Sequence, residues 1–135
     1  MNRIDQIALE AIRAKSLPQL ERTILDYVAE IPPKQVKSYE TGFIDQSGSA
    51  GLSPSSVALI LFEKYCRLWI SSHPYLPVSD AVKEFLDNYG TWHSGLKEIA
   101  LWRSCTQNGA PAEQIPEIEE FARTMIDYTN NRLTN

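Results

Sequence analysis

Residues 54–71 read PSSVALILFEKYCRLWIS, and this stretch decides the fold. Residues 57–62 are all hydrophobic, and further hydrophobic residues follow as far as Ile70. The charged residues within it would fall together on one narrow stripe of an α-helix: Glu63, Lys64 and Arg67. A helix that is hydrophobic on nearly every side has to be enclosed by other helices. The sequence therefore predicts a central helix at about 54–71 inside a helical bundle.

On both sides of this stretch, hydrophobic residues recur at steps of three and four, which indicates amphipathic helices. The expected helices cover residues 3–15, 17–31, 79–89, a segment from Thr91 or Ser94 to about 104, and a last segment from Pro116. We expect Ser16, Ser53 and Ser79 to cap the N-termini of their helices, because a serine hydroxyl accepts a free backbone N–H there. Gly90 is expected to end the fourth helix in a left-handed conformation.

The chain length suits a single domain. Its 135 residues are expected to form one all-α domain, a bundle of five or six helices over residues 1–135. Residues 34–53 lack the helical pattern and include the Gly/Ser-rich run 47–51, so we expect a long, flexible loop there. A short hairpin at 36–44 is the alternative for the first part of this loop.

Composition restricts the partners of the protein. The net charge is −4, which disfavours a large nucleic-acid interface or an anionic membrane surface. No hydrophobic run approaches the roughly 18 residues of a membrane-spanning helix, and the N-terminal residues lack a signal-peptide pattern. Two cysteines are too few for a disulfide scaffold. We therefore expect a cytoplasmic protein that binds no membrane, and the composition disfavours nucleic acid as its partner.

Residues that could ligate a metal or act as a nucleophile are scattered along the chain. They are Cys66, His73, His93 and Cys105. Structural zinc sites usually contain local pairs of ligands, and no such pair occurs here. A reactive thiolate needs an accessible, electropositive environment, whereas Cys66 lies in the most hydrophobic segment. We expect no metal and no cofactor, and a non-catalytic protein rather than an enzyme.

Aromatic residues gather in the second half of the chain. The residues that we expect to contact a partner are Tyr75, Tyr89, Trp92, His93, Trp102 and Arg103. Exposed Trp and Tyr next to Arg are common anchors of protein interfaces, because they bury a large area at a low entropic cost. This cluster favours a protein-binding module, such as an adaptor, inhibitor, chaperone or immunity-type protein, or a self-associating chain. The alternative is that the same aromatics complete the core around Trp69.

Two other functions stay open at this point. The first is a small-ligand site or small enzyme between the central helix and the 34–53 loop, with candidate residues Tyr39, Asp45, Ser53, Glu63, Arg67 and His73. The second is a helix-turn-helix DNA binder at 79–104, in which Lys97 and Arg103 would face DNA. Acidic residues outnumber basic ones in that segment, which disfavours contacts with phosphates.

The last expected helix begins with several acidic residues, Glu113, Glu117, Glu119 and Glu120. Carboxylates in a first turn stabilise the helix dipole, so we interpret them as a solvated face. The alternative is an acidic patch that contacts a basic protein.

Overall fold

The computed structural model describes residues 3–37 and 52–106, with side chains as far as Leu101. Within these ranges the elements are α1 (Arg3–Arg13), α2 (Leu17–Glu30), the short 3-10 helix η1 (Pro33–Gln35), α3 (Pro54–Ser72), α4 (Val78–Phe85), the π-helical turn η2 (Leu86–Gly90) and α5 (Ser94–Thr106). The described residues form no strand. The predicted all-α fold is therefore confirmed.

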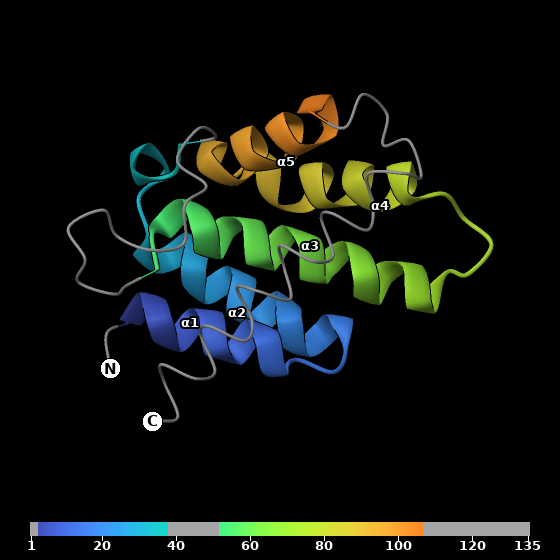
Figure 1. Cartoon of the computed structure of the whole chain (residues 1–135), viewed down its shortest axis with the longest axis horizontal. Coiled ribbons are helices and arrows are strands. Elements are labelled where there is room, and N and C mark those ends of the chain that lie inside the picture. The colour runs from blue at the N-terminus through green and yellow to red at the C-terminus, as the bar shows by residue number, and fades with distance from the viewer. Residues whose placement is uncertain (1–2, 38–51, 107–135) are drawn as a thin grey trace.

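Helix α3 is the centre of the bundle. It contacts α1 and α2 on one side and α4 and α5 on the other (Figure 1). Its residues 55–62 are all buried, and so are Tyr65, Cys66 and Trp69 farther along. The three charged residues predicted to share a stripe are indeed not buried. The predicted central hydrophobic helix at about 54–71 is confirmed, because only a helix with neighbours on several sides can bury so many of its side chains.

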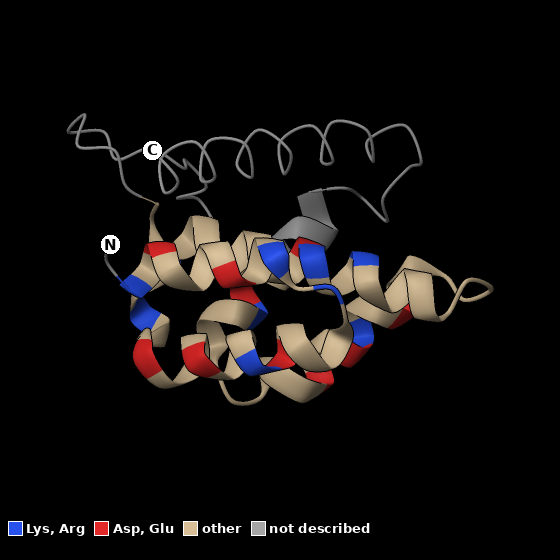
Figure 2. Ribbon diagram, turned by 90° about the horizontal axis from the view of Figure 1, so that it is seen from below, with Lys and Arg blue, Asp and Glu red and all other residues tan. Residues whose placement is uncertain are grey.

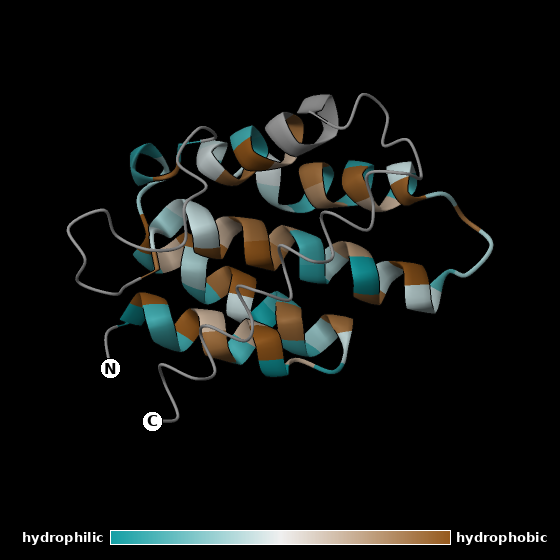
Figure 3. Ribbon diagram, in the orientation of Figure 1, coloured by the Kyte–Doolittle hydropathy of each residue, from teal (hydrophilic) through white to brown (hydrophobic). Residues whose placement is uncertain are grey.

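The other helices bury hydrophobic residues in the same core as α3. Figure 3 shows hydrophobic and hydrophilic residues alternating along these helices. Their largest fully buried side chains are Ile7, Leu20, Ile24, Tyr27, Phe85, Leu96 and Ile99. Acidic and basic residues are interspersed along the outer sides of the helices (Figure 2). The described part of the chain therefore has one continuous core and a surface of mixed charge.

Two of the predicted N-caps are confirmed. The hydroxyl of Ser16 accepts the backbone N–H of Gln19 at the start of α2. The hydroxyl of Ser53 accepts the backbone N–H of Ser56 at 3.0 Å, directly before Pro54 opens α3. Both helices thus begin where their sequences predict, since a cap of this kind depends only on neighbouring residues.

The predicted N-cap of the fourth helix and the predicted conformation of Gly90 are wrong. Helix α4 begins at Val78 with Pro77 as its N-cap, so Ser79 lies inside the first turn. Gly90 does not adopt the left-handed conformation; a Cβ there would lie 3.3 Å from atoms of Leu86 and Lys97. Glycine therefore serves close packing of η2 against α5, and the helical segment ends at Gly90 through a π-helical turn.

Helix α1 is shorter than predicted, ending at Arg13 instead of residue 15. The Lys64 ammonium donates a hydrogen bond to the carbonyl of Ile12 at 3.1 Å. Carbonyls at a helix C-terminus lack partners inside the helix, and a cation satisfies them well. Burial, followed by the charge of Arg67, lowers the pKa of Lys64. The central helix thus fixes where α1 ends.

The two ends of the predicted 34–53 loop are anchored to the bundle. Val36 and Leu52 are buried, and the backbone N–H of Lys37 donates to the Ser55 hydroxyl at 2.8 Å. The predicted hairpin at 36–44, the helix from Pro116 and its acidic residues lie wholly or largely outside the described residues.

Candidate functional site

The predicted partner-binding residues do not form one surface patch. Tyr75 is 96% exposed and Trp92 is 68% exposed, whereas Tyr89 and His93 are buried. The side chains of Trp102 and Arg103 lie outside the described part of the structure. Tyr75 precedes α4 and Trp92 follows η2, so the two exposed rings stand at opposite ends of the α4–η2 rod (Figure 1).

Tyr75 projects from a short, well-defined turn between α3 and α4, which we call the Tyr75 turn (residues 73–77). The backbone N–H of Leu76 donates to the carbonyl of His73 at 3.1 Å, which closes the turn around Pro74 and Tyr75. A proline at the second position of a turn has its φ angle already set, and Pro77 then leads directly into α4. The exposed ring is therefore displayed on a backbone with little freedom to lose.

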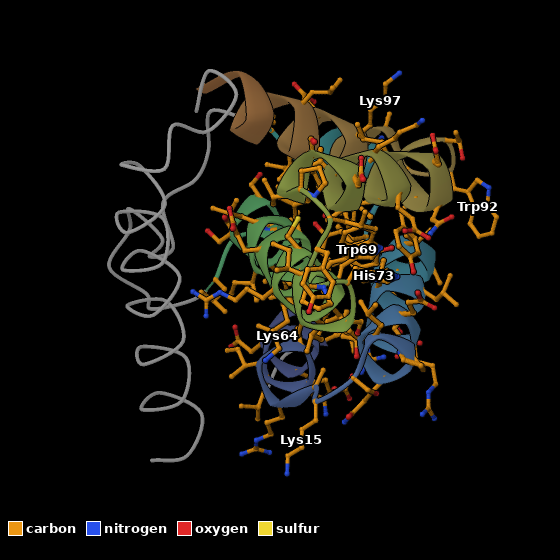
Figure 4. All side chains as sticks on the ribbon, turned by 90° about the vertical axis from the view of Figure 1, so that its right-hand side faces the viewer. Lys15, Lys64, Trp69, His73, Trp92 and Lys97 are labelled. Atoms are coloured by element: carbon orange, nitrogen blue, oxygen red, sulfur yellow. The ribbon has the colours of Figure 1, made fainter. Side chains whose placement is uncertain are left out.

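His73 braces the base of this turn. Its ring stacks on the indole of Trp69 with centroids 4.1 Å apart and an interplanar angle of 18°. Its Nδ1 lies 2.9 Å from the Trp69 carbonyl, which can only accept, so Nδ1 carries the proton and donates. Figure 4 shows the two rings together at the end of α3. The stack and the hydrogen bond fix the turn to the last part of the central helix.

Trp69 also connects α3 to α4. Its indole N–H donates a hydrogen bond to the carboxylate of Glu84. A bond to an ionised acceptor is stronger than one between neutral groups. Trp69, His73 and Glu84 thus hold both ends of the Tyr75 turn in place.

Hydrophobic side chains surround the Tyr75 turn on the surface. Leu76 lies within it, and Ile70 and Val78 flank it on α3 and α4; all three are exposed. The linker between these helices accordingly carries hydrophobic colour in Figure 3. These residues were not among the predicted contacts, although two prolines bracketing a hydrophobic pair were a visible sign in the sequence.

Trp92 lies at the other end of the rod, in the turn between η2 and α5. Its backbone N–H donates to the carbonyl of Tyr89 at 3.1 Å. Its side chain points away from the helices (Figure 4). Its neighbour His93, in contrast, points into the protein and fixes this turn.

His93 is a buried connector and not a surface contact. Its Nε2 donates to the carbonyl of Ile31 at 2.7 Å, and its Nδ1 accepts the backbone N–H of Leu96 at 3.1 Å. One partner can only accept and the other can only donate, so the ring is neutral with its proton on Nε2. His93 caps α5 and joins it to the end of α2. The prediction that it lies on the surface was wrong because the side chain satisfies these two backbone groups.

The surroundings of His93 are closely packed. The Tyr27 ring lies 5.7 Å from the His93 ring, and its hydroxyl donates to the Pro54 carbonyl at 2.6 Å. Burial raises the pKa of Tyr27. A Cβ on Gly95 would lie 2.6 Å from Cβ of Val36, which is too close to be accommodated without movement. Trp92 therefore projects from a rigid junction of α2, α3 and α5.

Tyr89 belongs to the core as well. Its ring packs against Tyr65 and Phe85, with centroids 5.9 Å and 5.3 Å away. The predicted exposure of Tyr89 was wrong because η2 continues the direction of α4 for one more turn, which keeps the ring facing α3. Tyr89 and His93 therefore belong to the interior of the fold and not to its surface.

The described residues of the alternative small-ligand site are spread along α3 from one end to the other. Ser53 caps the N-terminus of α3, and His73 caps its C-terminus, at the far end of a helix of 19 residues. Such a helix is about 28 Å long. Tyr39 and Asp45 lie outside the described residues. The side chains of residues 3–37 and 52–101 also include no cluster of three or more His, Cys, Asp or Glu arranged for a metal.

The helix-turn-helix alternative stays a prediction. Its first expected helix, at 79–89, corresponds to α4 followed by η2, and its second begins at Ser94. Lys97 and Glu98 are exposed side by side on α5, so the described surface of this helix carries both signs of charge.

Comparisons with protein-family models, with curated proteins and with solved structures gave no match for this chain. None of the helices in the described ranges combines the length and hydrophobicity that crossing a membrane requires. The candidate site is therefore defined by geometry alone: two exposed aromatic side chains, Tyr75 and Trp92, each on a turn that neighbouring residues fix.

Proposed function

We propose that this protein is a non-catalytic protein-binding module, and that Tyr75 and Trp92 are its anchors. The observation that supports this most is the Tyr75 turn, where an almost fully exposed aromatic ring is presented by a hydrogen-bonded proline turn. Folded proteins gain little from an exposed ring on a fixed turn, whereas a binding surface gains from it, because less entropy is lost on association.

Burial of the two exposed rings would supply enough hydrophobic free energy for specific association. A covered Tyr or Trp ring buries roughly 150–250 Å². At about 25 cal/mol per Å² this corresponds to roughly 4–6 kcal/mol for each ring, before the costs of association. The exposed Leu76, Ile70 and Val78 would add hydrophobic area next to Tyr75.

The two anchors fit within one interface. The α4–η2 rod between them spans residues 78–90, and at 1.5 Å per residue it is about 20 Å long. A standard interface buries about 800 Å² on each partner, which corresponds to a patch roughly 30 Å across. One partner with an extended contact surface can therefore cover both rings. A second copy of this chain is the other partner that we consider, and a cytoplasmic location is part of the proposal.

The test is affinity capture with matched variants. We expect partners retained by the wild-type chain to be retained by Leu101→Ala, which truncates an exposed hydrophobic residue elsewhere. We expect them to be lost by Tyr75→Ala and by Trp92→Ala. Sedimentation velocity of each variant shows whether the partner is a second copy. Unchanged capture and unchanged sedimentation in both variants would contradict the proposal.

A further inference from the structure

His93 is a titratable side chain that holds the junction between α2 and α5 closed. The residue is only 1% exposed. Its Nε2 donates to the carbonyl of Ile31 at 2.7 Å, and its Nδ1 accepts the backbone N–H of Leu96 at 3.1 Å. These two hydrogen bonds use one proton and one lone pair of the ring. Both of them together therefore require the neutral form of the imidazole.

A second proton on the His93 ring would be incompatible with the closed junction. It would lie on Nδ1, where the N–H of Leu96 already points, and two donors cannot form a hydrogen bond with each other. His93 also directly precedes Ser94, the first residue of α5. The N-terminus of a helix carries a partial positive charge, which repels a cation. Protonation would therefore remove the cap of α5 and replace it with a repulsion.

The ring has little room to avoid this contact by turning. Its Cε1 lies only 2.9 Å from the position that a Cβ on Gly95 would take. On another side the Tyr27 ring packs against it, with centroids 5.7 Å apart. Turning would also break the hydrogen bond to Ile31. The protonated ring can leave its position only if the segment that carries it moves away from α2.

The described surroundings of His93 contain no carboxylate at ion-pair distance. None of the ion pairs formed within residues 3–37 and 52–101 involves His93. The titratable side chain that contacts the ring is Tyr27, and burial raises the pKa of its hydroxyl, so that it stays protonated and neutral. The described charged side chains on the segments packed around the junction are exposed or partly exposed: Glu21, Arg22, Asp26 and Glu30 on α2, Lys34 and Lys37 at η1, Asp87 on η2, and Lys97 and Glu98 on α5. A protonated ring would therefore be stabilised only by contact with water.

We propose that His93 is an acid-sensitive latch: uptake of a proton by its ring opens the junction between α2 and α5 and releases the turn that carries Trp92. A histidine in water becomes charged as the pH falls through about 6.5. The open junction can bind this proton and the closed junction excludes it, so acid shifts the equilibrium toward the open form. The latch is a property of the chain alone. Its consequence, weaker binding through Trp92 in acid, rests on the proposed function.

The test is amide hydrogen exchange of the full chain, measured by NMR at pH values of about 7.5 and about 5.0. Protection is expressed relative to an unstructured chain at the same pH, which removes the pH dependence of the exchange chemistry. For Leu96 we expect protection to fall about 10- to 30-fold in acid, since the uptake of one histidine proton limits the effect to roughly 30-fold. In acid, exchange of Leu96 should depend much less on urea than exchange of the buried Leu61, because opening a junction exposes less surface than unfolding.

His93→Asn is the variant that removes the proton without removing the cap. Its amide oxygen can still accept the N–H of Leu96, and it does not titrate. We expect lower Leu96 protection than in the wild type at neutral pH, and a change of less than about threefold on acidification. His73→Asn is the matched control, since it replaces the other histidine of the chain, and it should retain the fall seen in the wild type.

A measurement on the wild type alone decides the question if His93→Asn does not fold. The ring nitrogen resonances of His93 should keep the pattern of the neutral Nε2–H form for as long as Leu96 stays protected. A doubly protonated His93 with Leu96 still protected would overturn the inference. An equal fall in His93→Asn and wild type would overturn it as well, and so would equal urea dependence of Leu96 and Leu61, because acid would then unfold the domain as a whole.

These measurements involve no partner. Loss of the latch would therefore leave partner capture through Tyr75 and Trp92 intact as a proposal. Failure of that capture would remove only the consequence of the latch for binding.

Discussion

The two histidines of the described structure stand at opposite ends of the α4–η2 rod and are used in different ways. His73 lies at the surface, stacks on Trp69 and donates one hydrogen bond to the last turn of α3. His93 is buried and satisfies a backbone carbonyl and a backbone N–H that come from different helices. The comparison teaches that an exposed aromatic anchor can be supported in two ways. The Tyr75 turn has a local brace, whereas Trp92 projects from a junction that organises the whole fold.

Removal of each histidine ring should lower the free energy of unfolding, and by very different amounts at the two positions. His93→Ala leaves a cavity and two backbone groups without partners, so we expect a loss of about 4 kcal/mol in the free energy of unfolding. His73→Ala removes a stacked ring and one hydrogen bond near the surface, so we expect a loss of about 1 kcal/mol. Urea denaturation of both variants measures the difference. Similar losses would contradict the distinction between the two ends.

A single added methyl group in the junction around His93 should also lower the free energy of unfolding. The Cβ of Gly95→Ala would lie 2.6 Å from Val36 Cβ and 2.8 Å from the carbonyl oxygen of Pro33. Overpacking of this kind typically costs 1–3 kcal/mol, and we expect about 2–3 kcal/mol because one neighbour is backbone. Gly90→Ala is the matched control, since its contacts would be 3.3 Å to side chains and its cost should be smaller. Equal midpoints for the two variants in urea would show that the junction is less tightly packed than its distances indicate.

Alkaline pH should weaken the fold at Tyr65, a buried residue of α3. The pKa of Tyr65 rises from 10.0 to about 12, first because of burial. The folded state then keeps a proton that the unfolded chain releases earlier. The contribution of the protonated Tyr65 hydroxyl to the free energy of unfolding is complete below about pH 10. It is lost as the pH rises toward about 12. The urea midpoint of the wild type should therefore fall more steeply above pH 10 than that of Tyr65→Phe, and parallel curves would contradict this.

The smallest effects on stability are expected at the anchors themselves. Tyr75→Ala and Trp92→Ala remove side chains that are largely in solvent, so the free energy of unfolding should change by less than about 0.5 kcal/mol. The Trp92 variant is the sharper test of the comparison between the two ends. Its neighbour His93 is expected to contribute strongly to stability, whereas Trp92 is not. A loss above about 1.5 kcal/mol, measured by thermal denaturation, would show that Trp92 is a structural residue.

Several parts of the candidate site could be predicted, and others could not. The prolines on both sides of Tyr75 predict a stiff loop, and the structure shows a hydrogen-bonded turn. Nothing in the sequence separates Trp92, which is exposed, from its neighbour His93, which is buried. The partner of His93 is the carbonyl of Ile31, 62 residues earlier in the chain.

By itself, the sequence determined the helical fold, the central helix and the caps at Ser16 and Ser53, because periodicity and capping depend on residues only a few positions apart. The tertiary structure alone decided that α1 ends at Arg13, that Gly90 serves packing, and which aromatics face solvent. Each of these depends on a side chain or backbone group that a different helix brings into contact. Local sequence patterns carry no information about contacts of that kind.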